Sequence, residues 1–339
     1  MPEQHAIAHI LGMLDDKIEL NQRMNDTLEA IARAIFKSWF VDFDPVIDNA
    51  LRAGKPLPDE LEEKAARRRE VFARARAEGR LAGLPEHLAR LFPDEFEESE
   101  VGWIPKGWKV VDIYSVAEVI YGAPFKSVLF NDDGEGLPII RIRDLSTYDP
   151  KVYTTERPPR AYQVEPGDVI VGMDGEFRAH LWQGPRAWLN QRLCCFKPRS
   201  GIPRAFIYLS IEEPLRFFEE AKTGTTVIHL GKADIDTFCV LLPPTDTLTL
   251  FGTQVEPLYS RIMSNAAQSR SLAALRDALL PKLISGKLWV KDAERIVESG
   301  LWRERYERLA GGYYVSVKLN PPGTITRFIG KSPSRTPTE

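Results

Sequence analysis

Cysteine is scarce in this 339-residue sequence: there are three, two of them adjacent, and none form a Cys-x-x-Cys pair. This excludes a disulfide framework and a zinc ribbon, and it indicates a reducing compartment. The chain also lacks any run of about 18 apolar residues, so no membrane span is predicted. Its N-terminal segment lacks the apolar core of a signal peptide. We therefore expect a soluble, cytoplasmic protein.

A large excess of one charge is also missing. The chain carries 45 basic and 48 acidic residues, for a formal net charge of −3. This balance excludes a freestanding polycationic nucleic-acid binder, but it leaves site-specific binding by local basic patches open. Hydrophobic residues make up 43% of the sequence, which is enough for a core and excludes wholesale disorder. The length predicts two or three structural units.

Two stretches, 6–40 and 247–285, have the pattern of long helices with a narrow apolar seam. Seam positions alternate in steps of three and four, as in a coiled coil. The same seam recurs in the second stretch, where Asn265 takes the place of Asn21, so the sequence contains an internal repeat. Because a middle domain joins the copies, we expect an antiparallel coiled coil with Asn21 and Asn265 fixing its register. The alternative is two helices packed on separate cores. The first seam is Ile7, Leu11, Leu14, Ile18, Asn21, Asn25, Leu28, Ala32 and Ile35.

The predicted fold class is α+β, with a β-rich middle domain flanked by the two long helices. Short β-branched runs separated by Gly, Pro or Asp turns predict the strands of this domain. These runs are Val110–Val111, Val116–Tyr121, Leu137–Ile142, Val169–Met173 and Phe238–Leu242. The predicted parts are a helical arm (1–45), a charged helical linker (46–100), the middle domain (101–246), a second helical region (247–298) and an irregular tail (299–339). In the linker, arginines alternate with glutamates, which is typical of a solvated, salt-bridged helix.

Residue patterns that could support catalysis are incomplete. Asn320–Gly323 resembles the Asn-Pro-Pro loop of adenine methyltransferases but lacks its aromatic residue. Gly224–Lys232 is about two residues too long for a phosphate-binding loop, and Ala233 stands where that loop requires Ser or Thr. His5 and His9 have the spacing of metal ligands on a helix, but no third ligand lies nearby in the sequence. We expect a chain without enzymatic activity, bound metal or cofactor. The alternative is a nuclease or methyltransferase fused to a helical arm.

Side chains suited to DNA gather at the turns of the middle domain. Arginine and lysine pair with guanine, asparagine and glutamine pair with adenine, and hydroxyl groups bind phosphates. For any single residue the alternative is a solvated surface group. Asp174–Glu176 is interpreted as a hairpin turn rather than an acid pair. The candidate DNA-binding residues are Lys126, Arg141, Arg143, Arg178, Asn190, Gln191, Arg192, Lys222, Thr223, Thr225, Thr226 and Lys232.

Four segments resemble the specificity subunits of type I restriction-modification systems, in the order found in that family. Residues 24–46 (MNDTLEAIARAIFKSWFVDFDPV) are similar to the central conserved region, and residues 275–286 (LRDALLPKLISG) are similar to the C-terminal one. The segment 102–108 (GWIPKGW) resembles the entrance of a target recognition domain, and 223–230 (TGTTVIHL) resembles its exit. The resemblance covers about residues 3–298.

This resemblance implies a fold and a role. A full family member carries two target recognition domains held apart by antiparallel conserved helices, and each domain reads one half of a split DNA site. Methyltransferase subunits, which bind S-adenosylmethionine, dock on the helices. Residues 1–4 resemble the stretch that follows a first recognition domain, so we expect the C-terminal half of a specificity subunit, with a single recognition domain at 101–246.

The implied partners are double-stranded DNA, a methyltransferase subunit, and either a second copy of the chain or another specificity chain. A restriction subunit remains open as a further partner. The alternative reading is a coiled-coil adaptor that does not bind DNA, or a decayed half-subunit that competes for methyltransferase subunits.

Overall fold

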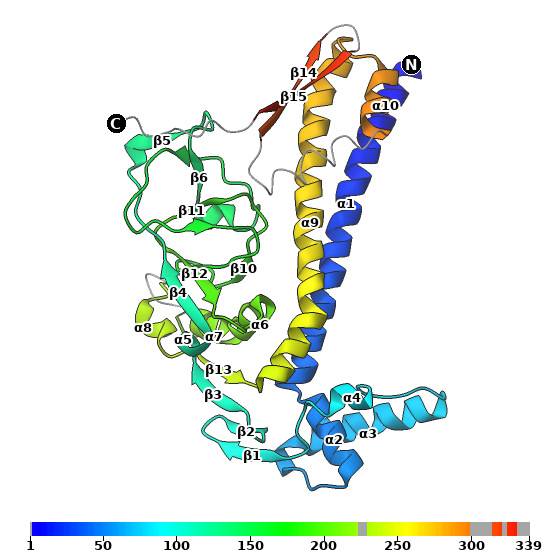
Figure 1. Ribbon diagram of the computed structural model, residues 1–339, viewed down its shortest axis with the longest axis vertical. Helices are drawn as coiled ribbons and strands as arrows, with labels where there is room; N and C mark the ends of the chain where they lie inside the picture. The colour runs from blue at the N-terminus through cyan, green and yellow to red at the C-terminus, as the bar shows by residue number, and fades with distance from the viewer. Residues whose placement is uncertain (1, 223–228, 299–313, 321–323, 331–339) are drawn as a thin grey trace. The chain divides into compact units, whose positions relative to one another are not determined.

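The computed structural model describes residues 2–222, 229–298, 314–320 and 324–330 (Figure 1). Its contacts divide the chain into two compact units. The first, here called the helical unit, joins Met1–Thr27 to Arg261–Glu339, and the second, the central unit, is Leu28–Ser260. The two long helices α1 (Pro2–Phe36) and α9 (Thr245–Ile284) each contribute to both units. The chain is α+β, as the sequence predicts.

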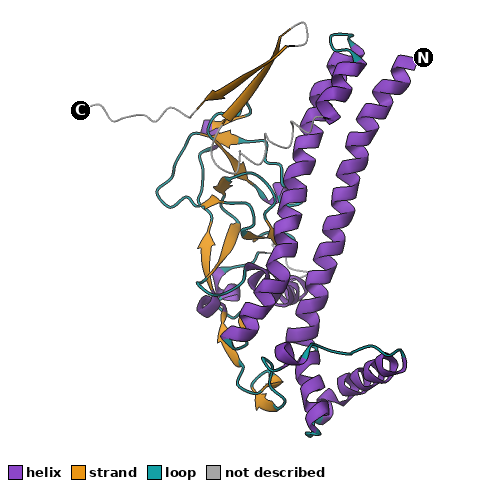
Figure 2. Cartoon of the chain, turned by 45° about the vertical axis from the view of Figure 1, so that its right-hand side comes forward, coloured by secondary structure: helices purple, strands orange, loops and turns teal. Residues whose placement is uncertain are grey.

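The helical unit is built from α1, α9 and the short helix α10 (Val290–Glu298), with α1 and α9 side by side in both views (Figures 1 and 2). Its buried apolar residues come from all three helices, and Ile7, Leu11 and Ile18 pack against them. The apolar seam is therefore covered by another helix rather than by a separate core. The buried cluster consists of Ile10, Leu14, Leu272, Leu279, Leu283 and Ala293.

Polar contacts across the seam show that α1 and α9 are antiparallel. Asp15 pairs with Arg276 at 2.6 Å, Asn21 Nδ2 donates to Ser269 Oγ at 3.2 Å, and Asn265 Nδ2 donates to Asn25 Oδ1 at 2.9 Å. Residue numbers thus rise along one helix as they fall along the other.

The sequence repeat and these hydrogen bonds together define a symmetry. The repeat carries Asn21 onto Asn265 and Asn25 onto Ser269. It therefore carries the bond from Asn21 to Ser269 onto the bond from Asn265 to Asn25. An approximate two-fold axis therefore passes between the helices at this point of the seam.

In the central unit, residues 44–95 form a small helical subdomain rather than a linker. Helix α2 (Asp44–Ala53) buries five of its residues, and α3 (Glu62–Ala77) packs on it. Asp48 is only 2% exposed and is held by Arg68 through two hydrogen bonds of 2.7 and 2.6 Å. The expected salt-bridged face is present on the outside of α3, where Arg69 pairs with Glu62. Because Arg68 points inward onto Asp48, this charged segment packs as a folded element. The helices η2 (Asp59–Leu61) and α4 (Glu86–Ala89) complete the subdomain.

An aromatic cluster joins the ends of both long helices to the middle domain. Phe40 lies in a π-helical turn, η1 (Lys37–Val41), directly after α1. Its ring centroid is 5.0 Å from Phe251 of α9, 5.4 Å from Phe206 of α6 (Arg204–Ser210), and 5.7 Å from Trp108. Each such ring pair adds about 0.5–1.5 kcal/mol to the burial of its area. The FKSWFVDF segment is thus a packing junction.

The middle domain contains two main sheets. The first has four antiparallel strands in the order β10–β9–β12–β4, and the second has five in the order β5–β7–β6–β11–β8, where β11 and β6 are parallel. Two further pairs, β13–β3 and β1–β2, lie outside these sheets. The strands are β1 (Phe96–Ser99), β2 (Gly102–Pro105), β3 (Lys109–Asp112), β4 (Ala117–Tyr121), β5 (Phe130–Asn131), β6 (Leu137–Ile140), β7 (Tyr153–Thr154), β8 (Gln163–Val164), β9 (Val169–Gly172), β10 (Ala179–Leu181), β11 (Ala187–Leu189), β12 (Leu193–Pro198) and β13 (Cys239–Leu242).

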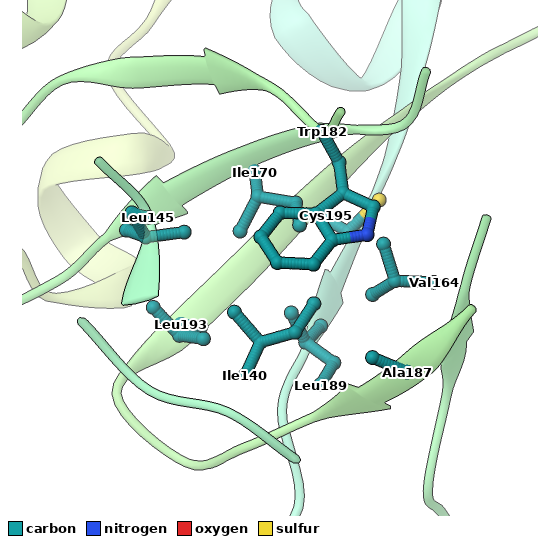
Figure 3. Close-up of a cluster of buried hydrophobic side chains, with 9 residues drawn as sticks. All are labelled: Ile140, Leu145, Val164, Ile170, Trp182, Ala187, Leu189, Leu193 and Cys195. Atoms are coloured by element: carbon teal, nitrogen blue, oxygen red, sulfur yellow. The ribbon is translucent and has the colours of Figure 1, made fainter. Parts of the chain in front are cut away.

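The core of the domain lies between the two sheets (Figure 3). The five-stranded sheet contributes Ile140 and Leu189, and the four-stranded sheet contributes Ile170 and Cys195. The largest member, Trp182, is fully buried and donates from Nε1 to the Pro185 carbonyl at 2.8 Å. Helices α5 (Ile113–Val116), α6 (Arg204–Ser210), α7 (Glu212–Lys222) and α8 (Lys232–Ile235) complete the domain.

Local hydrogen bonds shift several predicted boundaries. The predicted strand 116–121 begins one residue late, because the Asp112 carboxylate accepts from Ser115 N at 2.9 Å and caps α5. The predicted strand 137–142 ends at Ile140, where Asp144 draws the chain into the 3-10 turn η4 (Ile142–Asp144). The border predicted at residue 101 is crossed by the β1–β2 pairing.

The tail contains regular structure that the sequence analysis did not predict. Strands β14 (Tyr314–Asn320) and β15 (Thr324–Gly330) pair antiparallel, so the expectation of an irregular tail is wrong for these residues. Val315, Val317 and Leu319 alternate with polar residues, which is the strand pattern.

Candidate nucleic-acid interface

Four loops of the middle domain meet through backbone hydrogen bonds, and we call them the loop cluster: residues 122–126, 173–178, 190–192 and 229–231. Gln191 N donates to Ala123 O at 2.9 Å, Met173 N donates to Arg192 O at 2.8 Å, and Leu230 N donates to Met173 O at 2.7 Å. Loops far apart in sequence are thereby fixed to one another at the ends of β4, β9 and β12.

The turn at 190–192 is held tightly. Gly122 lies so close to it that a Cβ there would collide with the Asn190 carbonyl, so the approach requires glycine. Arg192 has φ of 67°, a left-handed conformation that costs a non-glycine residue of order 1–3 kcal/mol. The surrounding bonds, including Leu193 N to Asn190 O at 3.3 Å, stabilise this conformation. The turn is therefore rigid, and it carries the side chains of Asn190, Gln191 and Arg192.

Charged side chains of the loop cluster form a network around one carboxylate. Asp174 forms an ion pair with Arg192 Nη1 at 3.1 Å through one oxygen and contacts His229 Nδ1 at 2.6 Å through the other. Lys222, at the end of α7, donates to the His229 carbonyl at 2.7 Å and pairs with Asp234. Burial favours the neutral carboxyl of Asp234, but hydrogen bonds from Lys222 and from the Gly231 N–H outweigh it, so its pKa is lowered.

Arg141 and Arg143, two residues apart, have different surroundings. Arg141 is turned onto Asp144, with Nε and Nη2 donating at 3.0 and 3.2 Å, and its side chain is only 27% exposed. Arg143 is exposed and has no ion pair among the described residues. Its turn, η4, lies next to the end of β9, since Leu145 would be 3.4 Å from a Cβ at Gly172. Arg143 is therefore the more available cation.

The remaining candidates lie around the loop cluster. Lys126 is exposed, and its backbone N–H donates to Glu156 at 2.8 Å. Arg178 pairs with Glu176 at 3.3 Å within the turn between β9 and β10, which is the hairpin expected at 174–176. Lys232 pairs with Asp236 at 2.6 Å, and this hydrogen bond helps to lower the pKa of the Asp236 carboxyl.

Three candidate residues, Thr223, Thr225 and Thr226, lie outside the described residues. The register pair lies in the helical unit: Asn21 is 1% exposed and Asn265 is 2% exposed, and Asn21 Nδ2 is 3.5 Å from the Asn265 carbonyl. Asn21 also donates to Gln268 Oε1 at 2.9 Å.

The sequence does not mark Asp174 and His229 as partners. It predicts Asp174 only as a turn residue and His229 only as part of the exit motif. Their contact spans 55 residues, and no periodicity in the sequence marks such a pairing. The available signal was weak: both residues flank segments already chosen for their cations.

Within the described residues there is no group of three or more His, Cys, Asp or Glu side chains placed to hold a metal ion. Likewise, no helix in that part of the chain is both long and apolar enough to cross a membrane. The adjacent Cys194 and Cys195 are buried in β12, and burial raises the pKa of both thiols. They are core residues rather than nucleophiles.

Residues 105–262 match the family model described as "Type I restriction modification DNA specificity domain", which spans the sheets, the loop cluster and the first part of α9. This match confirms the resemblance to specificity subunits that the sequence indicates.

Among characterised proteins, the chain is 29% identical over 314 residues to the HindI specificity subunit of Haemophilus influenzae, covering 84% of this chain and 67% of that protein. It is 30% identical over 200 residues to the EcoBI specificity subunit of Escherichia coli, covering 58% of this chain and 42% of that protein. A solved specificity subunit from M. genitalium aligns with a TM-score of 0.46 and 14% identity over 84% of this chain and 61% of that one. The chain thus spans only part of the length of these relatives.

Proposed function

We propose that this chain is the DNA-specificity component of a type I restriction-modification complex and that it contributes one target recognition domain. The observation that carries the proposal is the specificity-domain match over residues 105–262, which contains a rigid loop cluster with exposed cations. A single domain reads one half of a split site, and a half-site of a few base pairs gives little discrimination against a genome. A second recognition domain is therefore needed.

The antiparallel helix pair offers a place where a second recognition domain can attach. An approximate two-fold axis relates the seam contacts of the two helices, and the middle domain is joined to the pair at one end, between Phe36 and Thr245. We propose that the other end serves a second recognition domain, from another copy or from another specificity chain. Methyltransferase subunits dock on the helices, and the complex acts in the cytoplasm. A homodimer selects an interrupted palindrome, because two-fold protein symmetry demands two-fold DNA symmetry.

In this proposal the chain has no catalytic role. The methyl transfer to adenine is performed by the methyltransferase subunit, which binds S-adenosylmethionine, and a restriction subunit joins only the cleaving form of the complex. The incomplete Asn-Pro-Pro segment at 320–323, without its aromatic residue, supports this division of labour.

Two measurements test the proposal. A mobility shift with double-stranded DNA, with and without the methyltransferase subunit, should show sequence-selective binding in the complex. Genome-wide methylation mapping of a host with this chain as its sole specificity protein should give an interrupted palindrome. A non-palindromic site would rule out the homodimer. Binding of S-adenosylmethionine by the purified chain in calorimetry would contradict the non-catalytic role, and complexes without DNA selectivity would favour the adaptor alternative.

A further inference from the structure

Asp174 is unusual for a residue on a DNA-binding face, because a carboxylate there repels phosphates. Its side chain is 24% exposed, whereas its partners Arg192 and His229 are 68% and 49% exposed. The carboxylate therefore lies beneath two groups that face outward. One anion holds one donor from each of two loops that are separate in the sequence.

Arg192 differs from the other three candidate arginines. Arg178 pairs with Glu176 inside its own loop, and both side chains are well exposed, at 65% and 70%. Arg141 is turned inward onto Asp144, and Arg143 has no ion pair among the described residues. Arg192 alone of the four combines an outward side chain with a mostly buried carboxylate from another loop.

The guanidinium of Arg192 is paired with Asp174, and its side chain remains 68% exposed, so it can still donate to a ligand. Only Nη1 is engaged by Asp174, and an arginine has five N–H donors in a planar fork. The left-handed backbone and the bond from Met173 N to Arg192 O fix the base of the side chain, and Asp174 fixes its end. A planar fork held in this way matches the O6 and N7 acceptors of guanine in the major groove.

His229 is positioned by the same carboxylate. When the Nδ1–H group donates its hydrogen bond to Asp174, the neutral ring keeps Nε2 as an acceptor on its opposite side. Lys222 holds the His229 carbonyl at 2.7 Å, so the backbone of this residue is fixed as well.

We propose that Arg192 reads a guanine in the half-site and that Asp174 is its positioning residue, holding Arg192 and His229 in place without itself touching the DNA. This inference rests on the proposed function of the chain as a DNA-specificity component, and it assigns the residue that makes one of the base choices.

The test compares selection from a randomised DNA library by the methyltransferase complex containing the wild-type chain, Arg192→Lys or Asp174→Asn. Arg192→Lys keeps the charge but loses the fork, and Asp174→Asn keeps the shape but loses the charge that orients it. Both variants should relax the same single guanine position, by on the order of 10- to 100-fold, with preferences elsewhere unchanged. Asp149→Asn is the matched control, because Asp149 pairs with Lys151 at 2.6 Å in the same domain and belongs to none of the four loops of the cluster.

The outcomes separate the possibilities. The inference is overturned, with the proposed function intact, if the two variants lose base preference at different positions of the DNA site. It is also overturned if the Asp174→Asn complex selects the same DNA site as the wild type. Equal weakening on all sequences with a lower melting temperature shows a merely structural role and also overturns it. If Asp174→Asn does not fold, Arg192→Lys still decides the base assignment, because its exposed side chain makes little contribution to folding. A wild-type complex without any preferred sequence defeats the proposed function itself.

Discussion

The helical unit and the middle domain differ in how well their contacts can be predicted from sequence patterns. In the helical unit the apolar seam repeats every seven residues, and the buried asparagines occupy equivalent places in the two copies. In the middle domain the contacts that shape the loop cluster join Ala123 to Gln191 and Asp174 to His229, and no repeated sequence pattern predicts them. A periodic pattern identifies its partner, whereas a loop contact depends on the whole fold.

The largest expected effect is on the core of the middle domain. Trp182→Ala removes a fully buried ring between the two sheets and should lower the free energy of unfolding by about 3–5 kcal/mol. Trp289→Ala is the matched control in the helical unit, because Trp289 is 75% exposed and its removal should change stability by less than about 0.5 kcal/mol. Denaturant unfolding of both variants measures the difference. Equal losses would mean that burial does not separate the two positions.

The same contrast explains how much the sequence could predict. The two helices, their antiparallel pairing and most strands of the middle domain follow from periodicity and from turn residues. The turn conformation at Arg192 and its partner Asp174 do not, because they depend on a left-handed backbone at Arg192 and on contacts between loops, such as the close approach of Gly122 to Asn190. Arg141 is the reverse case: the sequence predicts a DNA-binding cation at a turn, and the structure adds a hydrogen bond to Asp144 that the sequence does not predict.

Arg141 and Arg143 allow an arginine that stabilises the fold to be compared with one that is exposed for DNA binding. Arg141→Ala leaves Asp144, which is 5% exposed, without its guanidinium partner and should cost about 1–3 kcal/mol of stability. Arg143→Ala should leave the melting temperature unchanged but reduce the salt dependence of DNA binding by about one phosphate contact. Thermal unfolding and binding at several salt concentrations check both. The assignment would be reversed if Arg141→Ala lowered only DNA affinity.

A smaller effect is expected at the register pair of the helical unit. Asn265→Leu replaces a buried amide on the seam with an apolar side chain and should raise stability by about 1 kcal/mol while loosening register or association state. Arg23→Leu, at an exposed position on α1, is a surface control. Calorimetric melting with sedimentation analysis tests this expectation. A variant that melts lower and keeps one association state would show that the asparagine stabilises the pair rather than specifying it.

The smallest effect belongs to a long-range contact that lies in solvent. Hydrogen bonds from Lys106, and then from Lys55, lower the pKa of Glu95 from 4.5 to about 2. Since the folded-state pKa is the lower one, the charged carboxylate stabilises the fold above pH 4.5, and this contribution is lost as the pH falls towards 2. Lys106→Met should therefore flatten the pH dependence of the melting temperature in this window, and Glu95→Gln should flatten it further. An unchanged slope in Glu95→Gln would contradict the expectation. A contact can thus join distant parts of the chain and still contribute little when water surrounds it, so burial rather than sequence separation decides which contacts hold the middle domain together.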